Sequence, residues 1–204
     1  MMNTQMDEVQ KKAEYIVEQL NKKGKILFGK ITDKAVKKYV CLKCDYAANK
    51  VQTECFHKEF RSFYGMIFWS RKRLEYYFKM MTDKEKILKK VLDALYQVPK
   101  GNGNKCVEFS FATKLIHTVD NNKPIYDSNV ANVLEKRVRG NTGGERIEFC
   151  LEIYEFLEKL HQILLKEKTV KKLISVFRKQ HKINSINMSD VKILDFLLWA
   201  LGRK

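Results

Sequence analysis

The chain contains few of the residues that interrupt regular structure, with only 2 prolines and 9 glycines among its 204 residues. This scarcity argues against a sandwich or barrel built on many tight turns, and it favours long helices. Long apolar runs are also missing, since the longest covers only residues 196–201, whereas a membrane span needs roughly 20 residues. The amphipathic first twenty residues lack the apolar centre of a signal peptide. We therefore expect a cytoplasmic protein without a membrane partner.

Acidic residues are scarce relative to basic ones, with 24 Asp and Glu against 40 Lys and Arg, which gives a formal net charge of +16. An excess of this size says nothing about the fold but favours a polyanionic partner. Nucleic acid is the first candidate, because Lys and Arg neutralise its phosphates, and a membrane surface is the second. The remaining explanation is a lysine-rich protein whose charge serves only its solubility.

The 5 cysteines are an odd number, and in the cytoplasm we expect them to be reduced, so disulfides are excluded as the main stabilising links. Cys41, Cys44, Cys55 and His57 have a spacing that a four-ligand zinc site would accept. However, both halves of this motif look helical, and the residues between them lack the glycines of a zinc knuckle. We therefore expect buried or idle thiols, no bound metal and no cofactor.

Apolar residues recur at spacings of three and four along most of the chain, which predicts an all-α fold, a compact bundle of eight or nine helices. The first helix is expected to cover about residues 4–22 and to end at the Asn-Lys-Lys-Gly sequence that closes with Gly24. Thr82 followed by Glu85 predicts a capping box at the start of a helix over 82–98.

Two glycine- and asparagine-rich segments, 99–104 and 140–144, are the clearest breaks in the helical pattern. The first break divides the chain into an N-terminal helical lobe, 1–98, and a second helical lobe, 99–204. The alternative is one continuous domain.

The segment 109–133 carries the hypothesis about function. On a helix, Ser110, Lys114 and His117 lie at spacings of four and three and so share one polar face. A loop then brings Asp127 to the start of the next helix, near the positive end of the helix dipole. The purely structural interpretation is that Asp127 is an N-cap and that Lys114 and His117 are solvated.

Three stretches of the second half match motifs of a known family. Residues 110–112, Ser-Phe-Ala, match a Lys/Ser-x-Ala motif, and residues 124–130, Pro-Ile-Tyr-Asp-Ser-Asn-Val, match an apolar-Asp-x-x-Val motif whose Asp is catalytic. The two motifs are 17 residues apart, counted from Ser110 to Asp127. The segment 195–203 is similar to a late helix that ends in Gly-Arg. On these residues the chain resembles the helix-hairpin-helix DNA glycosylase superfamily, the endonuclease III-like and adenine-glycosylase-like enzymes.

The chain also departs from this family. The hairpin glycines are not found directly before Ser110, and the segment 101–105 offers a second register with Lys105 as the hairpin lysine. The four cysteines that hold an iron–sulfur cluster in some members do not follow Arg203.

The resemblance implies an enzyme that hydrolyses the N-glycosidic bond of a damaged, mismatched or modified base in DNA, which is expected as a partner more than RNA. Asp127 would be the catalytic carboxylate, with Ser110 and Lys114 beside it. Ser110 at the lysine position favours simple hydrolysis, although Lys105 or Lys114 could supply an amine for a Schiff base. The residues expected to contact DNA are Gly101, Asn102, Gly103, Asn104, Lys105, Ser128 and Asn129.

The alternative is a helical nucleic-acid-binding protein without catalysis. In either case the basic stretch 166–182 is the strongest candidate for a face that follows phosphates. Tyr126, Phe109 or Trp69 could line the space for a base, although core packing is the more common role for each. His161 lies near an apolar stripe and is expected to be a hydrogen-bonded interior histidine. The oligomeric state is left open.

Overall fold

The computed structural model describes the chain except residues 1, 67–68, 101–102 and 204, and the side chains of residues 2–4 and 25. The all-α prediction is confirmed, because the regular structure of the described residues consists of helices alone. There are eleven helices within this part of the chain, so the expected count of eight or nine was wrong. They are α1 (Met2–Lys30), α2 (Asp33–Ala47), the 3-10 helix η1 (Lys50–Gln52), α3 (Glu54–Tyr64), α4 (Arg71–Thr82), α5 (Leu88–Gln97), α6 (Phe109–Val119), α7 (Ser128–Leu134), α8 (Gly143–Leu164), α9 (Lys168–His181) and α10 (Asp190–Gly202).

Helix α1 does not end near residue 22 but continues through Gly24 to Lys30. A Cβ atom at Gly24 would lie 2.7 Å from Cδ2 of Leu173, which belongs to α9. Gly24 therefore allows α9 to pack closely on α1, and it does not terminate the helix. Sequence alone cannot distinguish these two uses of a glycine, because the second depends on a partner that is distant in the chain.

The capping box expected at Thr82 was also wrong. Thr82 is the last residue of α4, and its hydroxyl donates a hydrogen bond to the carbonyl of Phe78. The Glu85 carboxylate accepts from the two backbone N–H groups that follow it, just ahead of α5. A complete capping box is found instead at α8, between Thr142 and Glu145.

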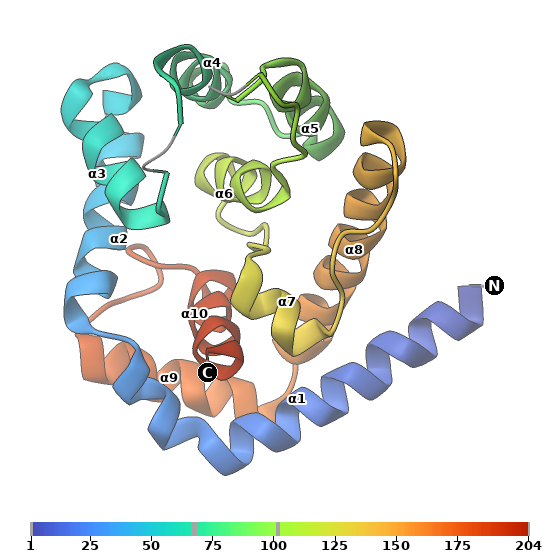
Figure 1. Ribbon diagram of the computed structural model, residues 1–204. Coiled ribbons are helices and arrows are strands. Elements are labelled where there is room, and N and C mark those ends of the chain that lie inside the picture. The colour runs from blue at the N-terminus through green and yellow to red at the C-terminus, as the bar shows by residue number, and fades with distance from the viewer. Residues whose placement is uncertain (1, 67–68, 101–102, 204) are drawn as a thin grey trace.

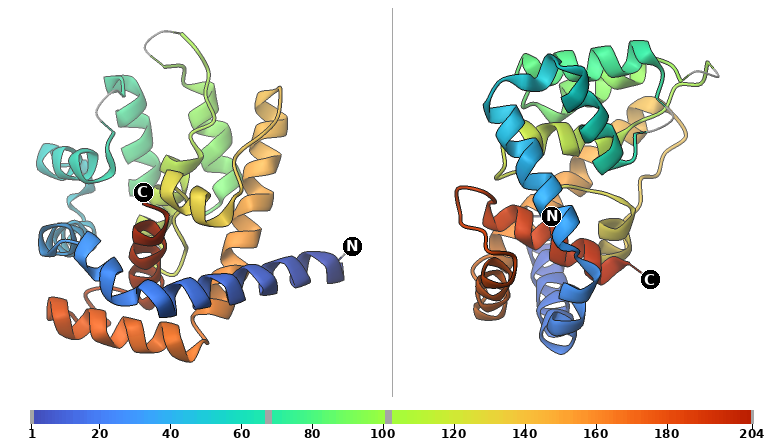
Figure 2. Two further views of the ribbon diagram at one scale, coloured as in Figure 1. Left: turned by 60° about the horizontal axis from the view of Figure 1, so that its bottom comes forward. Right: turned by 90° about the vertical axis from the view of Figure 1, so that its left-hand side faces the viewer.

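The helices are arranged around α6, α7 and α10 (Figure 1). Helix α1 crosses one side of the molecule and packs against α8, α9 and α10, while α4 and α5 pack against α6 on the opposite side. Helices α2 and α3 form a third side, and two further views show the same arrangement (Figure 2). Buried apolar residues from before and after residue 98 belong to one contiguous core. No helix in the described residues is long and apolar enough to cross a membrane.

The C-terminal end of α10 packs directly on α7 at Gly202. A Cβ atom there would lie only 1.9 Å from the backbone oxygen of Asn129 and 3.0 Å from Cγ2 of Val133. The carbonyl of Gly202 also accepts a hydrogen bond from Nδ2 of Asn132, at 3.2 Å. Because Asn129 presents backbone at this contact, a side chain at position 202 could be accommodated only by moving one helix.

We expect Gly202→Ala to destabilise the fold by about 1–3 kcal/mol, the range for overpacking a tight contact. The measurement is the free energy of unfolding in urea. Gly144→Ala is the matched control, because Gly144 lies in the first turn of α8 with nothing within 4 Å of an added Cβ. The control should be neutral or slightly stabilising, since alanine favours a helix more than glycine does. Equal stability of the Gly202→Ala variant and the wild type would contradict this account of the α7–α10 contact.

Candidate functional site

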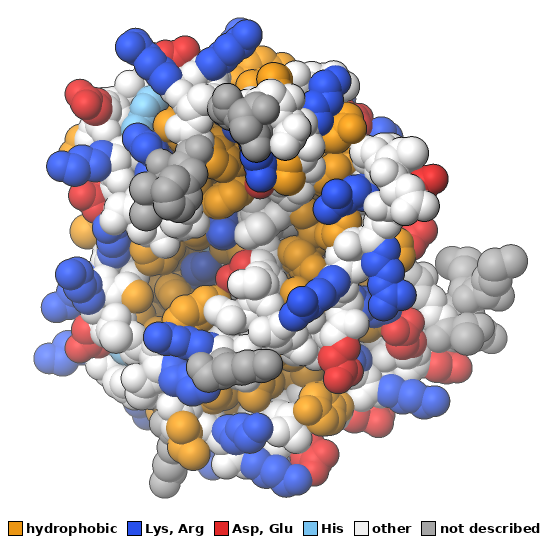
Figure 3. All heavy atoms as spheres, viewed as in Figure 1, with side chains coloured by type: hydrophobic (Ala, Val, Ile, Leu, Met, Phe, Trp, Pro, Cys, Tyr) orange, Lys and Arg blue, Asp and Glu red, His pale blue; other side chains and the backbone are white. Residues whose placement is uncertain are grey.

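The molecule contains a cavity of about 450 Å³ between α2, α3, α6 and α10. Figure 3 shows the hollow on one face, with basic side chains around it and both basic and acidic atoms inside. Its volume lies in the range of about 300–1,000 Å³ that is typical of small-molecule sites. The aromatic part of its wall consists of Phe63, Tyr64, Phe196 and Trp199.

The charged part of the cavity lining is mostly positive. The basic residues are Lys30, Lys34, Lys38, Lys114, Lys192 and Arg203, and the acidic residues are Asp127 and Asp195. Six positive side chains against two negative ones make the cavity attractive to an anion. The aromatic wall and the basic lining together suit a ligand that has both a flat ring and a phosphate group.

Asp127 is both the N-cap of α7 and part of the cavity wall. Its Oδ1 accepts hydrogen bonds from the backbone N–H groups of Asn129 and Val130, each at 2.9 Å. Its Oδ2 accepts none from the described residues. The capping bonds orient the carboxylate and leave one oxygen available to a ligand. The structural and the functional interpretations of Asp127 are therefore compatible.

Lys114 is buried, which corrects the expectation that it is solvated. Only 8% of the residue is exposed, because the rings of Tyr64 and Phe111 cover its ammonium group at 5.5 and 4.7 Å from the ring centroids. Its Nζ donates a hydrogen bond to Oγ of Ser110, at 2.9 Å. Burial lowers the pKa of Lys114 to about 8, with Asp127 and Glu108 raising it and Lys192 lowering it. About a tenth of this amine is therefore uncharged at pH 7, far more than for an ordinary lysine.

His117, the third member of the predicted polar face, is also buried and not solvated, with 1% of the residue exposed. Its Nδ1–H donates to the carbonyl of Lys123, at 2.6 Å, and its Nε2 accepts from the hydroxyl of Tyr39, at 2.9 Å. Burial, with help from the charge of Lys192, lowers the pKa of His117 to about 4. The neutral imidazole thus connects α2 to the loop between α6 and α7.

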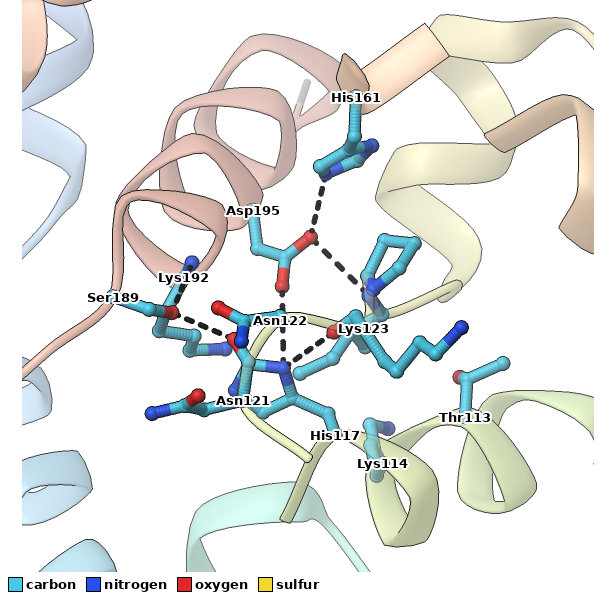
Figure 4. Close-up of polar contacts among 12 residues, drawn as sticks. Thr113, Lys114, His117, Asn121, Asn122, Lys123, His161, Ser189, Lys192 and Asp195 are labelled. Carbon is cyan, nitrogen blue, oxygen red and sulfur yellow. Dashed lines mark hydrogen bonds and ion pairs between the residues drawn. The ribbon is translucent and has the colours of Figure 1, made fainter. Parts of the chain in front are cut away.

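Asp195 holds the same loop from the other side (Figure 4). Its Oδ1 accepts from the backbone N–H of Ile125, at 3.2 Å, and lies 3.1 Å from Nε2 of His161. Its Oδ2 is buried without a hydrogen-bond partner and lies 4.0 Å from Nδ1 of His117. The prediction of a hydrogen-bonded interior histidine at His161 is confirmed. Sequence reasoning missed Asp195, although one carboxylate within the apolar run of α10 was a signal for a buried polar contact.

The structure brings Ser110, Lys114 and Asp127 together but not the other predicted site residues. Gly101 and Asn102 lie outside the described residues, and neither Gly103, Asn104 nor Lys105 lines the cavity. Lys105 is exposed, donates to Oε1 of Gln97 and lies over the ring of Tyr96. Ser128 is exposed, and Asn129 contributes its backbone N–H to Asp127.

The predicted aromatic residues pack in or against the core and not along the cavity. Phe109 and Tyr126 are buried and stack on each other, with ring centroids 4.3 Å apart. Trp69 packs edge-on against Tyr77 and Phe111. The sequence pattern missed the aromatic residues that do line the cavity, because they come from two helices, α3 and α10, that are distant in the chain.

The lysines of α9 also lie away from the cavity lining. Cys41, Cys44 and Cys55 are exposed, and the ring of His57 stacks on Phe78 at 3.8 Å. Across the described parts of the chain, no group of three or more His, Cys, Asp or Glu residues could hold a metal ion.

We expect the stability of the fold to decrease as the pH falls from about 6.5 to about 4. In this range His117 binds a proton in the unfolded chain but stays neutral in the folded protein. Acid therefore favours the unfolded state. The free energy of unfolding should fall by about 2 kcal/mol between pH 7 and 4.5 because of this group alone. The comparison is with His117→Asn, whose amide can still donate to the Lys123 carbonyl. If both proteins lose the same stability over this range, His117 is not the titrating group.

Comparison with known proteins does not indicate a function for this chain. No protein-family model matches the chain, no curated protein is significantly similar to it, and no solved structure matches it significantly. The function is therefore inferred from the residues that line the cavity and from the chemistry available to them.

Proposed function

We propose that this chain is a DNA glycosylase, a divergent member of the helix-hairpin-helix superfamily, that removes a damaged, mismatched or modified base. The proposal depends on one observation: the carboxylate of Asp127 and the buried amine of Lys114 open into the same aromatic-walled cavity. A glycosylase needs a carboxylate or nucleophile beside the sugar and an adjacent space for the base.

The cavity is suited to a base that has been rotated out of the DNA stack. Such rotation costs a few kcal/mol, which stacking on aromatic side chains and contacts to phosphates can offset. Phe63 and Trp199 both line the cavity and come from different helices, α3 and α10. The basic residues Lys34, Lys38 and Arg203 lie on the same lining and would hold the phosphates on either side of the base.

Asp127 would act on the charge that develops during bond cleavage. As the bond between C1′ and the base breaks, positive charge builds on the deoxyribose, as it does in glycoside hydrolysis. A carboxylate fixed beside the sugar stabilises this charge and orients an attacking water. The two capping hydrogen bonds to Oδ1 keep Asp127 in place for this role.

Lys114 supplies a second possible nucleophile, and it is better placed than Lys105, which is exposed and does not line the cavity. The lone pair of the amine would attack C1′ while the electrons of the C1′–N bond leave with the base, which takes up a proton. Opening of the sugar ring then breaks the C1′–O4′ bond, protonates O4′ and leaves a C=N bond to Lys114. An amine with a lowered pKa is suited to this step.

We expect Asp127→Asn to lower the rate of base release by at least about 100-fold, because a neutral amide stabilises positive charge poorly. DNA binding should be nearly unchanged, because asparagine caps a helix as well as aspartate does. The measurement is the release of bases from oligonucleotides with a panel of lesions and modified bases, with alkali revealing abasic sites.

Asp120→Asn is the matched control for this variant. Asp120 lies in the same loop and also accepts a backbone N–H, that of Asn122, but it does not line the cavity. It should release bases at the wild-type rate. Equal release by wild type and the Asp127→Asn variant would remove Asp127 from the mechanism.

We expect borohydride to trap the wild-type protein covalently on DNA, because it delivers hydride to the C=N bond and leaves a stable amine. Lys114→Gln should lose this adduct, whereas Lys105→Gln should keep it. The measurement is a gel shift under denaturing conditions, with mass spectrometry to locate the modified lysine. Base release by the wild type without any adduct would mean that water is the nucleophile and that Lys114 contributes only its charge.

A nucleic-acid-binding protein without catalysis is the second candidate. The observation that favours it is the excess of basic residues along the cavity, which requires no chemistry to bind phosphates. The base-release assay separates the two candidates: DNA binding that weakens steeply with salt, without release from any substrate, would favour this one.

A further inference from the structure

The cavity contains a second buried lysine that the proposed reaction does not use. Lys192 lies on α10 and is 5% exposed, and Lys114 lies on α6 and is 8% exposed. Both line the same cavity, and Figure 4 shows them on the two helices beside the loop that leads to α7. Lysine is rarely buried without an ionic partner, so two in one cavity need an explanation.

Neither lysine has a direct ion pair. Among the described residues, no carboxylate oxygen lies within 4.0 Å of either ammonium nitrogen. Lys192 instead packs its Nζ on two rings, 5.1 Å from the centroid of Tyr39 and 4.7 Å from that of Phe196. Two amines that share a poorly solvated space oppose each other's protonation, so their titrations are coupled.

The surrounding charges decide which of the two amines keeps its proton. For Lys192, burial lowers the pKa, but Asp195 and Asp127 both raise it. For Lys114, burial dominates and Lys192 lowers the pKa further, against the effects of Asp127 and Glu108. Glu108 is also engaged elsewhere, in an ion pair with Arg73 at 3.2 Å.

The groups in direct contact with the Lys114 ammonium carry no charge at neutral pH. Ser110 and Phe111 are neutral, and burial holds the pKa of Tyr64 well above its ordinary value. His117 on the same helix is neutral as well, since its pKa is about 4. After burial itself, the positive charge of Lys192 lowers the pKa of Lys114 further.

We propose that Lys192 is a positioning residue that acts on Lys114 through its charge: in a cavity that already disfavours a buried ammonium, the charge of Lys192 increases the fraction of the Lys114 amine that is uncharged, and therefore nucleophilic, near neutral pH. The role of Lys192 in the reaction rests on the proposed function of Lys114. The coupling of the two amines is a property of the protein alone and can be measured without DNA.

The experiment is trace labelling with acetic anhydride, which reacts only with uncharged amines and is small enough to enter the cavity. Labelling of the peptides that contain Lys114 and Lys192 is measured by mass spectrometry across pH 6–11. In the wild type, Lys114 should reach half of its full reactivity at a lower pH than Lys192. The opposite order would overturn the proposal, and this comparison requires no variant.

Lys192→Gln should move the labelling midpoint of Lys114 upward by on the order of one pH unit. Labelling at pH 7.5 would then fall roughly five- to tenfold. Lys192→Met keeps the length of the side chain and its apolar stem, and should give the same shift if the glutamine variant folds poorly. Lys37→Gln is the control, because Lys37 is exposed on α2, where solvent screens its charge, and it should leave the midpoint unchanged.

A purely structural role for Lys192 would leave the midpoint of Lys114 where it is, and a folded Lys192 variant with that result overturns the proposal. Failure of the proposed function looks different. If the midpoint shifts but borohydride traps no adduct in the wild type, the coupled pair exists and the Schiff-base chemistry does not. If an adduct forms with the same pH dependence in wild type and the Lys192→Gln variant, the chemistry stands and the role of Lys192 is refuted.

Discussion

The buried carboxylate of Asp195 is the interaction on which the rest of the site depends. The segment 120–127 has no regular structure of its own, so its backbone groups need partners from elsewhere. Asp195 accepts the N–H of Ile125, and the neutral imidazole of His117 donates to the carbonyl of Lys123. These contacts come from α10 and α6, and they fix the path of the chain into α7. The position of Asp127 relative to Lys114 follows from that path.

The same arrangement concentrates buried polar groups around one cavity. Burying an amine without an ion pair is unfavourable, and the fold compensates only in part, through aromatic rings and through carboxylates beyond ion-pair distance. The consequence is that Lys114 and His117 both have lowered pKa values. Strongly perturbed groups that meet in a cavity are typical of functional sites, because the perturbation is what makes them reactive. The fold is thus destabilised at the site where we propose the reaction.

Several predictions from the sequence failed for a common physical reason. Gly24 was expected to end the first helix, but it allows close packing against α9, and that use depends on a neighbour that is distant in the chain. Lys114 and His117 were expected in solvent because they share a polar helix face. Their burial is due to residues from α2 and α3, such as Tyr39 and Tyr64, whose position no local pattern reveals.

The sequence by itself determined the all-α class, because helical periodicity is a local property that each segment carries independently. It also determined that Ser110 and Lys114 share a helix face and that Asp127 caps the following helix, because both follow from spacing within one turn. Only the tertiary structure decided that Lys114 and Asp127 line one cavity and that Asp195 and Lys192 line it with them. Those contacts connect helices from both halves of the chain, so they exist only once the helices have packed.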